Sequence, residues 1–156
     1  MNIERVYIAL GSNIGDRAST LAQAIVLLSR RIGRPVAQSM VIETEPVGFA
    51  SEYSFLNQVV AIDTELSPWE VLEATQEIEC ELGRRQKSVG EVYHDRTCDI
   101  DIILFGDRIV EEEQLTIPHK RFRERRFVLE PLAEIAPNVT DPVTGKKIEE
   151  LLWDVS

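Results

Sequence analysis

The sequence is poor in cysteine and lacks long apolar runs. Its two cysteines, Cys80 and Cys98, have neither a metal-ligand spacing nor the pattern of a disulfide framework. We therefore expect a reducing cytoplasm and two small, buried thiols. No apolar run approaches the roughly 20 residues that cross a bilayer, and the N-terminus has no signal-peptide pattern. These absences predict a cytoplasmic protein without a membrane partner.

Positive charge is also scarce. The chain has 17 Lys and Arg against 27 Asp and Glu, a net charge of −10, which argues against nucleic acid as a partner. Residues 119–126 are the exception, because basic side chains dominate them: Lys120, Arg121, Arg123, Arg125 and Arg126. A basic patch in an acidic protein suits a small polyanion better than a long one.

Alternating apolar residues predict four core strands, and apolar residues at helical spacing predict two helices. The strands are expected at residues 5–10, 36–44, 54–66 and 99–105, and the helices at 17–32 and 68–83. Asp16 and Ser67 are the expected helix caps, and Gly33 and Gly83 are the expected helix stops. The glycine turn at 11–16 lacks the sequence of a Walker or Rossmann phosphate loop, so a structural turn is favoured.

The order of these elements is typical of the ferredoxin-like split βαβ arrangement. We predict an α+β fold: a ferredoxin-like antiparallel sheet (βαββαβ core) with helices packed on it and C-terminal additions. The additions are residues 108–110 as a hairpin partner of the fourth strand, a core helix at 127–136 and a short helix at 147–153. The chain is long enough to bury a core without staples, and we expect residues 1–156 to form one domain, a monomer or weak homodimer.

Two aspartates open the fourth strand. Because strand side chains alternate, Asp99 and Asp101 point to one face and Ile100 to the other. Carboxylates on one face repel each other unless a cation holds them, and Mg²⁺ binds through one or two carboxylates together with substrate phosphates. Arg96 suits a phosphate in the same place. An edge-strand acidic pair that nearby lysines or arginines screen is equally compatible with this pattern alone.

The sequence contains eight short motifs, of which Arg-x-x-Asp-x-Asp at the head of the apolar strand, residues 96–106, is the most specific. The others are residues 11–13, 44–48, 55–57, 76–79, 83–84, 118–119 and 125–127. Together and in this order they resemble the 6-hydroxymethyl-7,8-dihydropterin pyrophosphokinase family of the folate pathway. The likeness covers nearly the whole chain.

The resemblance implies transfer of the β,γ-diphosphoryl group of ATP to the hydroxymethyl group of 6-hydroxymethyl-7,8-dihydropterin, with release of AMP, in folate biosynthesis. It implies two Mg²⁺ ions held by Asp99 and Asp101. The implied catalytic residues are Arg84, Arg96, Asp99, Asp101, His119 and Arg125. The implied nucleotide contacts are Gln76, Glu79, Arg84, Lys87, Arg96, Ile102, Thr116, His119, Lys120 and Arg125. The implied pterin contacts are Thr44, Val47, Phe55, Asn57, Asp99 and Phe127.

Several of these residues also have plainer interpretations. Gln76 and Glu79 share one side of a helix, where solvated surface is the ordinary expectation, and Phe55 alone reads as core. The Asn57 amide, set among apolar residues, either pairs with backbone or contacts a ligand.

Two other functions stay open. One is a metal-dependent phosphotransferase on the same scaffold that cleaves at the γ-phosphate. The other is a non-catalytic ferredoxin-like module that binds RNA or metal. The net charge and the lack of a stacking-aromatic RNA motif or a Cys-x-x-Cys site argue against the second.

Overall fold

The computed structural model describes residues 2–44, 54–83 and 98–156. Their order along the chain matches the predicted one. The elements are β1 (Glu4–Ser12), α1 (Arg17–Arg31), β2 (Gly33–Gln38), β3 (Ile42–Thr44), β4 (Phe55–Thr64), α2 (Pro68–Gly83), β5 (Asp99–Phe105), β6 (Val110–Glu111), β7 (Thr116–Ile117), the 3-10 helix η1 (Phe122–Glu124), α3 (Arg126–Ile135) and α4 (Ile148–Asp154).

The main sheet has the strand order β2–β4–β1–β5, and β3 also pairs with β4. Every neighbouring pair is antiparallel. The first strand of the chain therefore lies in the centre, between strands that are distant from it in sequence. This is the order of a ferredoxin-like βαββαβ unit, so the predicted fold class is confirmed.

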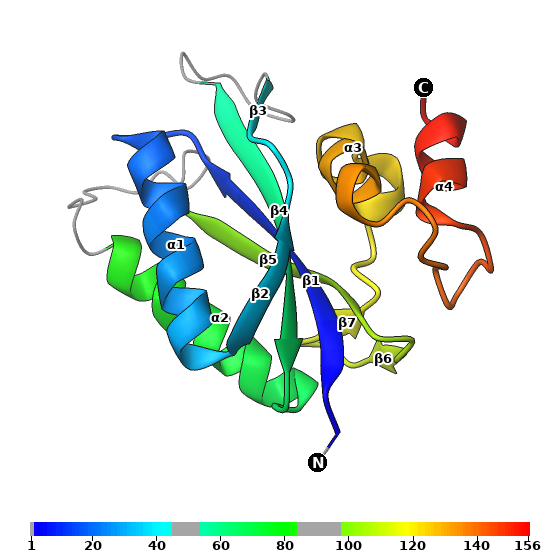
Figure 1. Cartoon of the computed structure of the whole chain (residues 1–156), viewed down its shortest axis with the longest axis horizontal. Helices are drawn as coiled ribbons and strands as arrows, with labels where there is room; N and C mark the ends of the chain where they lie inside the picture. Colours follow the sequence, from blue (N-terminus) through cyan, green and yellow to red (C-terminus); the bar gives the residue numbers. More distant parts are fainter. Residues whose placement is uncertain (1, 45–53, 84–97) are drawn as a thin grey trace.

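Apolar side chains cover both faces of the sheet. On one face, Val6, Ile8 and Leu10 pack with residues of α1 and α2. On the other face, Tyr7 and Ala9 pack with residues of α3 and α4. Figure 1 shows the two pairs of helices on opposite sides of the sheet. The C-terminal additions thus bury the face that α1 and α2 do not cover, which stabilises the fold by about 25 cal/mol for each Å² of apolar area.

Both long helices begin at the predicted caps. Asp16 accepts the Ser19 N–H at 3.2 Å at the start of α1. At the start of α2, the Ser67 N–H donates to Glu70 Oε1 (2.8 Å) and the Glu70 N–H donates to Ser67 Oγ (3.2 Å), which is a complete capping box. No helix in the described ranges is long and apolar enough to cross a membrane.

The predicted strand at 36–44 begins earlier and is interrupted. β2 starts at Gly33, where a Cβ would lie 2.0 Å from the Asp63 carbonyl oxygen. Glycine is therefore needed for the close approach of β2 to β4, besides ending the helix. Pairing breaks at Ser39, whose hydroxyl accepts the Val59 N–H at 2.9 Å, and resumes in β3.

The expectation that both cysteines are buried is wrong for Cys80, which is exposed. It lies on α2 outside the row of buried residues formed by Val71, Ile78 and Leu82. Helical periodicity puts a residue two positions after Ile78 on the opposite side of the helix. Cys98 is buried, as expected.

The predicted hairpin between residues 108–110 and the fourth strand is also wrong. Val110 pairs with Ile117 of β7 instead. Gly106 turns the chain with a φ of 54°, a conformation that glycine adopts without strain. The backbone of β5 is contacted by His119, whose N–H donates to the Ile103 carbonyl at 2.9 Å.

Candidate active site

Three strand termini meet at one end of the sheet. β1 ends there, and β4 and β5 begin there, as Figure 1 shows. In the register, Gly11 of β1 lies opposite both Asn57 of β4 and Asp99 of β5. Directly opposed residues share a face of the sheet, so the Asn57 and Asp99 side chains stand on one face with only a glycine between them.

The absence of a side chain at Gly11 leaves room on that face. A Cβ there would lie 3.4 Å from Asn57 Oδ1 and 3.6 Å from the ring carbon Cδ1 of Phe55. The sequence favours a structural turn at this glycine, yet its place in the register makes it the floor between an amide, a phenyl ring and a carboxylate. This role follows from the pairing of Gly11 with Asn57 and Asp99. A single sequence does not show which residues pair across a sheet.

Asp99 and Asp101 are half-buried, and they alternate with the buried Ile100 and Ile102. The two isoleucines belong to the core under α1 and α2, so the aspartates point to the face that α3 covers. Glu79 of α2 accepts the Ile100 N–H at 2.7 Å, which ties the start of β5 to the helix.

Carboxylates converge around the start of β5. Burial, together with the nearby charges of Glu79, Asp99 and Asp101, raises the pKa of the Cys98 thiol to about 12. In the described ranges, no three His, Cys, Asp or Glu side chains gather into a metal-binding group. Mg²⁺ usually completes its ligands with substrate phosphates and water, so a carboxylate pair is enough protein contribution for such a site.

The described residues of the predicted pterin set lie on this same face. Asn57 is 6% exposed, and its Nδ2 donates to Thr44 Oγ1 at 2.7 Å, so within the described part of the chain the amide pairs with a side chain. Phe55 lies two residues before Asn57 on β4, so its side chain points to the same face. Phe127, at the start of α3, is half-buried against the core under α3 and α4.

A basic hollow of about 340 Å³ lies next to β7. Lys120, Arg121 and Arg125 line it together with His119, and the rest of its wall is formed by Thr116, Leu115, Gln114 and one acidic residue, Glu113. Arg121, Gln114, Glu113 and Leu115 are missing from the predicted site residues. Arg121 could have been found as part of the basic run, whereas nothing in the sequence distinguishes Gln114.

His119 is a neutral hydrogen-bond donor in this hollow. Burial lowers the pKa of its imidazole to about 4, with the charges of Arg125, Arg121 and Lys120 acting in the same direction. The Arg121 N–H donates to His119 Nδ1 at 3.1 Å. In the neutral ring the proton must then be on Nε2, which can donate to an anion.

The basic run does not act as one patch. Arg123 forms a bidentate ion pair with the buried Asp141 (2.5 and 3.0 Å), and Arg126 pairs with Glu130 at 3.0 Å. Two of the five basic side chains are therefore used in structural pairs. The other three line the hollow.

The remaining predicted nucleotide residues are more scattered. Gln76 is exposed on α2 and lines a second hollow of about 620 Å³, which shares Gln114 with the basic one. The Ile102 side chain is buried in the core, 5% exposed, so only its backbone faces the sheet edge. Arg84, Lys87, Arg96 and Val47 lie outside the described residues.

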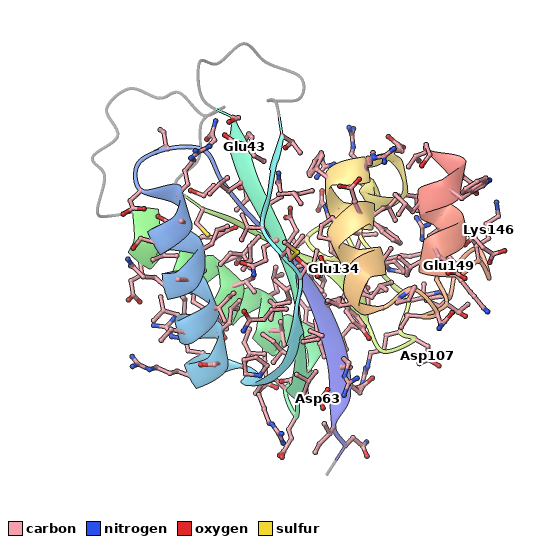
Figure 2. All side chains as sticks on the ribbon, turned by 45° about the horizontal axis from the view of Figure 1, so that its top comes forward. Glu43, Asp63, Asp107, Glu134, Lys146 and Glu149 are labelled. Carbon is pink, nitrogen blue, oxygen red and sulfur yellow. The ribbon has the colours of Figure 1, made fainter. Side chains whose placement is uncertain are left out.

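Arg17 holds the two strands that carry Thr44 and Phe55. Its Nη1 donates to the Ser54 carbonyl at 2.8 Å and lies 3.2 Å from Glu43 Oε2. Figure 2 shows Glu43 at the same end of the sheet as the strand termini. Nothing in the sequence distinguishes Arg17, which stands among ordinary helix residues.

A ferredoxin-like sheet with a carboxylate pair on one strand and a basic hollow beside it has the features of an enzyme that transfers phosphate groups. The family model described as 7,8-dihydro-6-hydroxymethylpterin-pyrophosphokinase (HPPK) matches residues 7–137. The chain belongs to this family and is a pyrophosphokinase of folate synthesis.

Named relatives agree with the family. The chain is 50% identical over 133 residues to the 2-amino-4-hydroxy-6-hydroxymethyldihydropteridine pyrophosphokinase of Porphyromonas gingivalis, covering 85% of this chain and 90% of the relative. It is 47% identical over 145 residues to the Bacillus subtilis protein of the same name, covering 92% and 85%.

The fold also matches a solved structure. Wild-type Plasmodium falciparum HPPK-DHPS superposes with a TM-score of 0.75 at 15% identity, covering 98% of this chain. The chain spans 45% of the length of that solved protein. At this identity the likeness concerns the fold alone.

Proposed function

We propose that the pyrophosphoryl donor is ATP, that its β,γ-diphosphoryl group passes to the hydroxymethyl oxygen of 6-hydroxymethyl-7,8-dihydropterin, and that AMP leaves, with Mg²⁺ as the cofactor. The position of Asp99 and Asp101 carries this proposal. On one side of β5, Asn57 lies across Gly11 from Asp99. On the other side, His119 donates its N–H to the β5 backbone and also lines the basic hollow. Two substrates that meet over β5 would therefore have Asn57 on one side, to bind the pterin, and the basic hollow on the other side, to bind the phosphates.

Asp99 and Asp101 fit Mg²⁺. They are oxygen donors on one face of one strand and are half-buried, and Mg²⁺ is commonly held by one or two carboxylates and substrate phosphates. When bound, the metal neutralises phosphate charge and aligns the attacking and leaving oxygens. We propose two such ions, because the resemblance of the Asp-x-Asp motif to that of the family implies a pair.

The residues of the basic hollow act on the phosphates. His119 donates through Nε2, and because its imidazole is neutral it does so without changing its charge at pH 7. Arg125 adds a fixed positive charge that offsets charge growing on the bridging oxygen as AMP leaves. Arg84, Lys87 and Arg96 join this role in the proposal through the resemblance of their motifs.

The pterin lies on the face above Gly11. Its flat ring gains from stacking on the Phe55 and Phe127 rings, and its amide-like edge would otherwise be buried without partners. The Asn57 carboxamide supplies Oδ1 to that edge while Nδ2 stays paired with Thr44. Room for the ring comes from the missing side chain at Gly11.

One product analysis tests the proposal. The protein is incubated with MgATP and 6-hydroxymethyl-7,8-dihydropterin, and the nucleotide product is identified by chromatography. AMP formed in equal amount to the pterin product supports the proposal. ADP would contradict it and indicate transfer of the γ-phosphate alone. A reaction without the pterin serves as the control, since AMP formed in its absence would indicate a contaminating activity.

A further inference from the structure

The turn that carries the basic hollow is held in place by an ion pair outside the hollow. The guanidinium of Arg123 donates through Nε to Asp141 Oδ2 (2.5 Å) and through Nη2 to Oδ1 (3.0 Å). Asp141 is fully buried, while the Arg123 side chain is 24% exposed. Bidentate geometry fixes the orientation of a guanidinium as well as its position.

Asp141 is itself held rigidly. Besides Arg123, it accepts hydrogen bonds from the Val143 N–H (3.0 Å) and from Thr144 Oγ1 (2.9 Å). Burial alone would raise the pKa of this carboxyl, but these hydrogen bonds and the charge of Arg123 hold it below its usual value. The C-terminal segment between α3 and α4 therefore presents a fixed negative charge to η1.

η1 lies between the residues that line the hollow. Phe122 is fully buried, and the Arg123 guanidinium lies over its ring, 4.8 Å from the centroid. The Arg125 N–H donates to the Phe122 carbonyl at 3.1 Å, and the Glu124 N–H donates to the Arg121 carbonyl at 3.0 Å. Two anchors, one apolar and one ionic, thus set the backbone from which Arg121 and Arg125 extend.

We propose that Asp141, acting through Arg123, is a positioning residue for the nucleotide phosphates: it fixes η1 so that Arg121 and Arg125 converge on one anion. This inference rests on the proposed function, in which the hollow binds the triphosphate. Without the ion pair, the turn keeps the Phe122 anchor and its backbone hydrogen bonds but loses the contact that fixes Arg123 to the C-terminal segment. Arg123 would then also add an uncompensated charge beside the hollow.

The test compares MgATP affinity with stability. In the double variant Arg123→Met/Asp141→Leu both charges are replaced by apolar groups of similar size, so no unpaired charge is left, although Val143 N–H and Thr144 Oγ1 lose their acceptor. Far-UV circular dichroism and thermal unfolding check its fold, and titration calorimetry measures the dissociation constants of MgATP and of the pterin. We expect a lower melting temperature but a folded protein, an MgATP affinity weakened by about tenfold or more, equivalent to about 1.4 kcal/mol, and a pterin affinity within about twofold of wild type.

A matched control separates positioning from stability. Thr144→Val removes one hydrogen bond to the same Asp141 carboxylate and leaves the ion pair with Arg123 intact. We expect it to lower the melting temperature while MgATP affinity stays within about twofold. Lys146→Ala, which breaks an exposed ion pair with Asp154 at the outer surface (Figure 2), is expected to change neither quantity.

Each outcome decides the inference. MgATP affinity retained in the folded double variant would overturn it, as would equal losses of affinity in Thr144→Val. If the double variant does not fold, Asp141→Asn replaces it, with the same expected loss. Failure of the wild-type protein to bind MgATP would instead refute the proposed function, so the two failures are distinguishable.

Discussion

The guanidinium carbon of Arg125 lies 5.6 Å from the centre of the Phe127 ring. This cation–π contact joins a residue of the basic hollow to one proposed for pterin stacking. A cation over one face of a ring contributes about 0.5–1 kcal/mol at an exposed site. The two proposed substrate sites therefore share a contact at the start of α3.

Phe127→Leu tests the pterin site through this contact. Leucine keeps an apolar side chain on α3 but has no π-face for the pterin or for Arg125. We expect pterin binding to weaken by about 0.5–1.5 kcal/mol from the lost stacking, and Phe127→Ala to weaken it by a few kcal/mol because burial is lost as well. Fluorescence titration with the pterin measures both. An unchanged affinity in Phe127→Ala would rule out stacking on this ring.

Asp101→Asn tests the proposed metal site. The change removes one carboxylate charge from the α3 face of β5 and preserves the shape of the side chain, so we expect turnover to be lost and the fold to stay intact. Initial rates and circular dichroism measure the two effects. Asp107→Asn is the control, because Asp107 is exposed beyond the opposite end of β5, away from the strand termini. Turnover near the wild-type rate in Asp101→Asn would exclude the metal role.

The imidazole of His119 makes stability depend on pH. Its pKa is about 4 in the folded protein against 6.5 for an unperturbed histidine. Between these values the unfolded chain binds more protons, so the free energy of unfolding rises with pH across this window. His119→Asn keeps an oxygen near the position of Nδ1 but does not titrate. We expect urea unfolding at pH 4.5 and 7 to show a smaller pH difference for the variant, and an equal difference would contradict the assignment.

Gly11→Ala tests the floor of the pterin site. The new methyl would contact Asn57 Oδ1 at 3.4 Å and the Phe55 ring at 3.6 Å, which the fold can accommodate but a stacked ring cannot. We expect pterin affinity to fall about tenfold, or about 1.4 kcal/mol, with little change in melting temperature. Calorimetry and thermal unfolding report the two quantities.

Gly33→Ala is the contrasting glycine variant. Its methyl would meet the Asp63 carbonyl oxygen at 2.0 Å, so β2 must move away from β4. We expect destabilisation of about 3 kcal/mol, near the upper end for overpacked sites, and a normal pterin affinity in the fraction that remains folded. Should Gly11→Ala prove the more destabilising of the two, the assignment of open space above Gly11 would be wrong.

Local patterns were sufficient to predict the helices, the strand order along the chain and the alternation on β5. Capping by Asp16 and Ser67 depends on residues three positions away, and periodicity depends on near neighbours. The errors concern long-range relationships. The pairing of Val110 with β7 rather than β5, and the interruption of the second strand at Ser39, depend on partners that only the assembled sheet provides.

The same distinction applies to the site. Motif resemblance could select Asp99, Asn57 and His119, but it could not show that Asn57 and Asp99 face each other across Gly11. Nor could composition reveal that two residues of the basic run form ion pairs elsewhere, Arg123 with Asp141 and Arg126 with Glu130. The partner of each arginine is a carboxylate up to 18 residues away along the chain, and only the folded structure brings the two together.

The unequal environments of the two thiols make the protein suitable for spectroscopic labelling. The thiolate is the reactive form of cysteine, and the Cys98 thiol is buried with a pKa of about 12, so a maleimide dye at neutral pH will attach at the exposed Cys80. That position lies on α2, one residue after Glu79, which holds the start of β5. A single fluorophore there would report on substrate binding in the natural sequence, without any introduced cysteine.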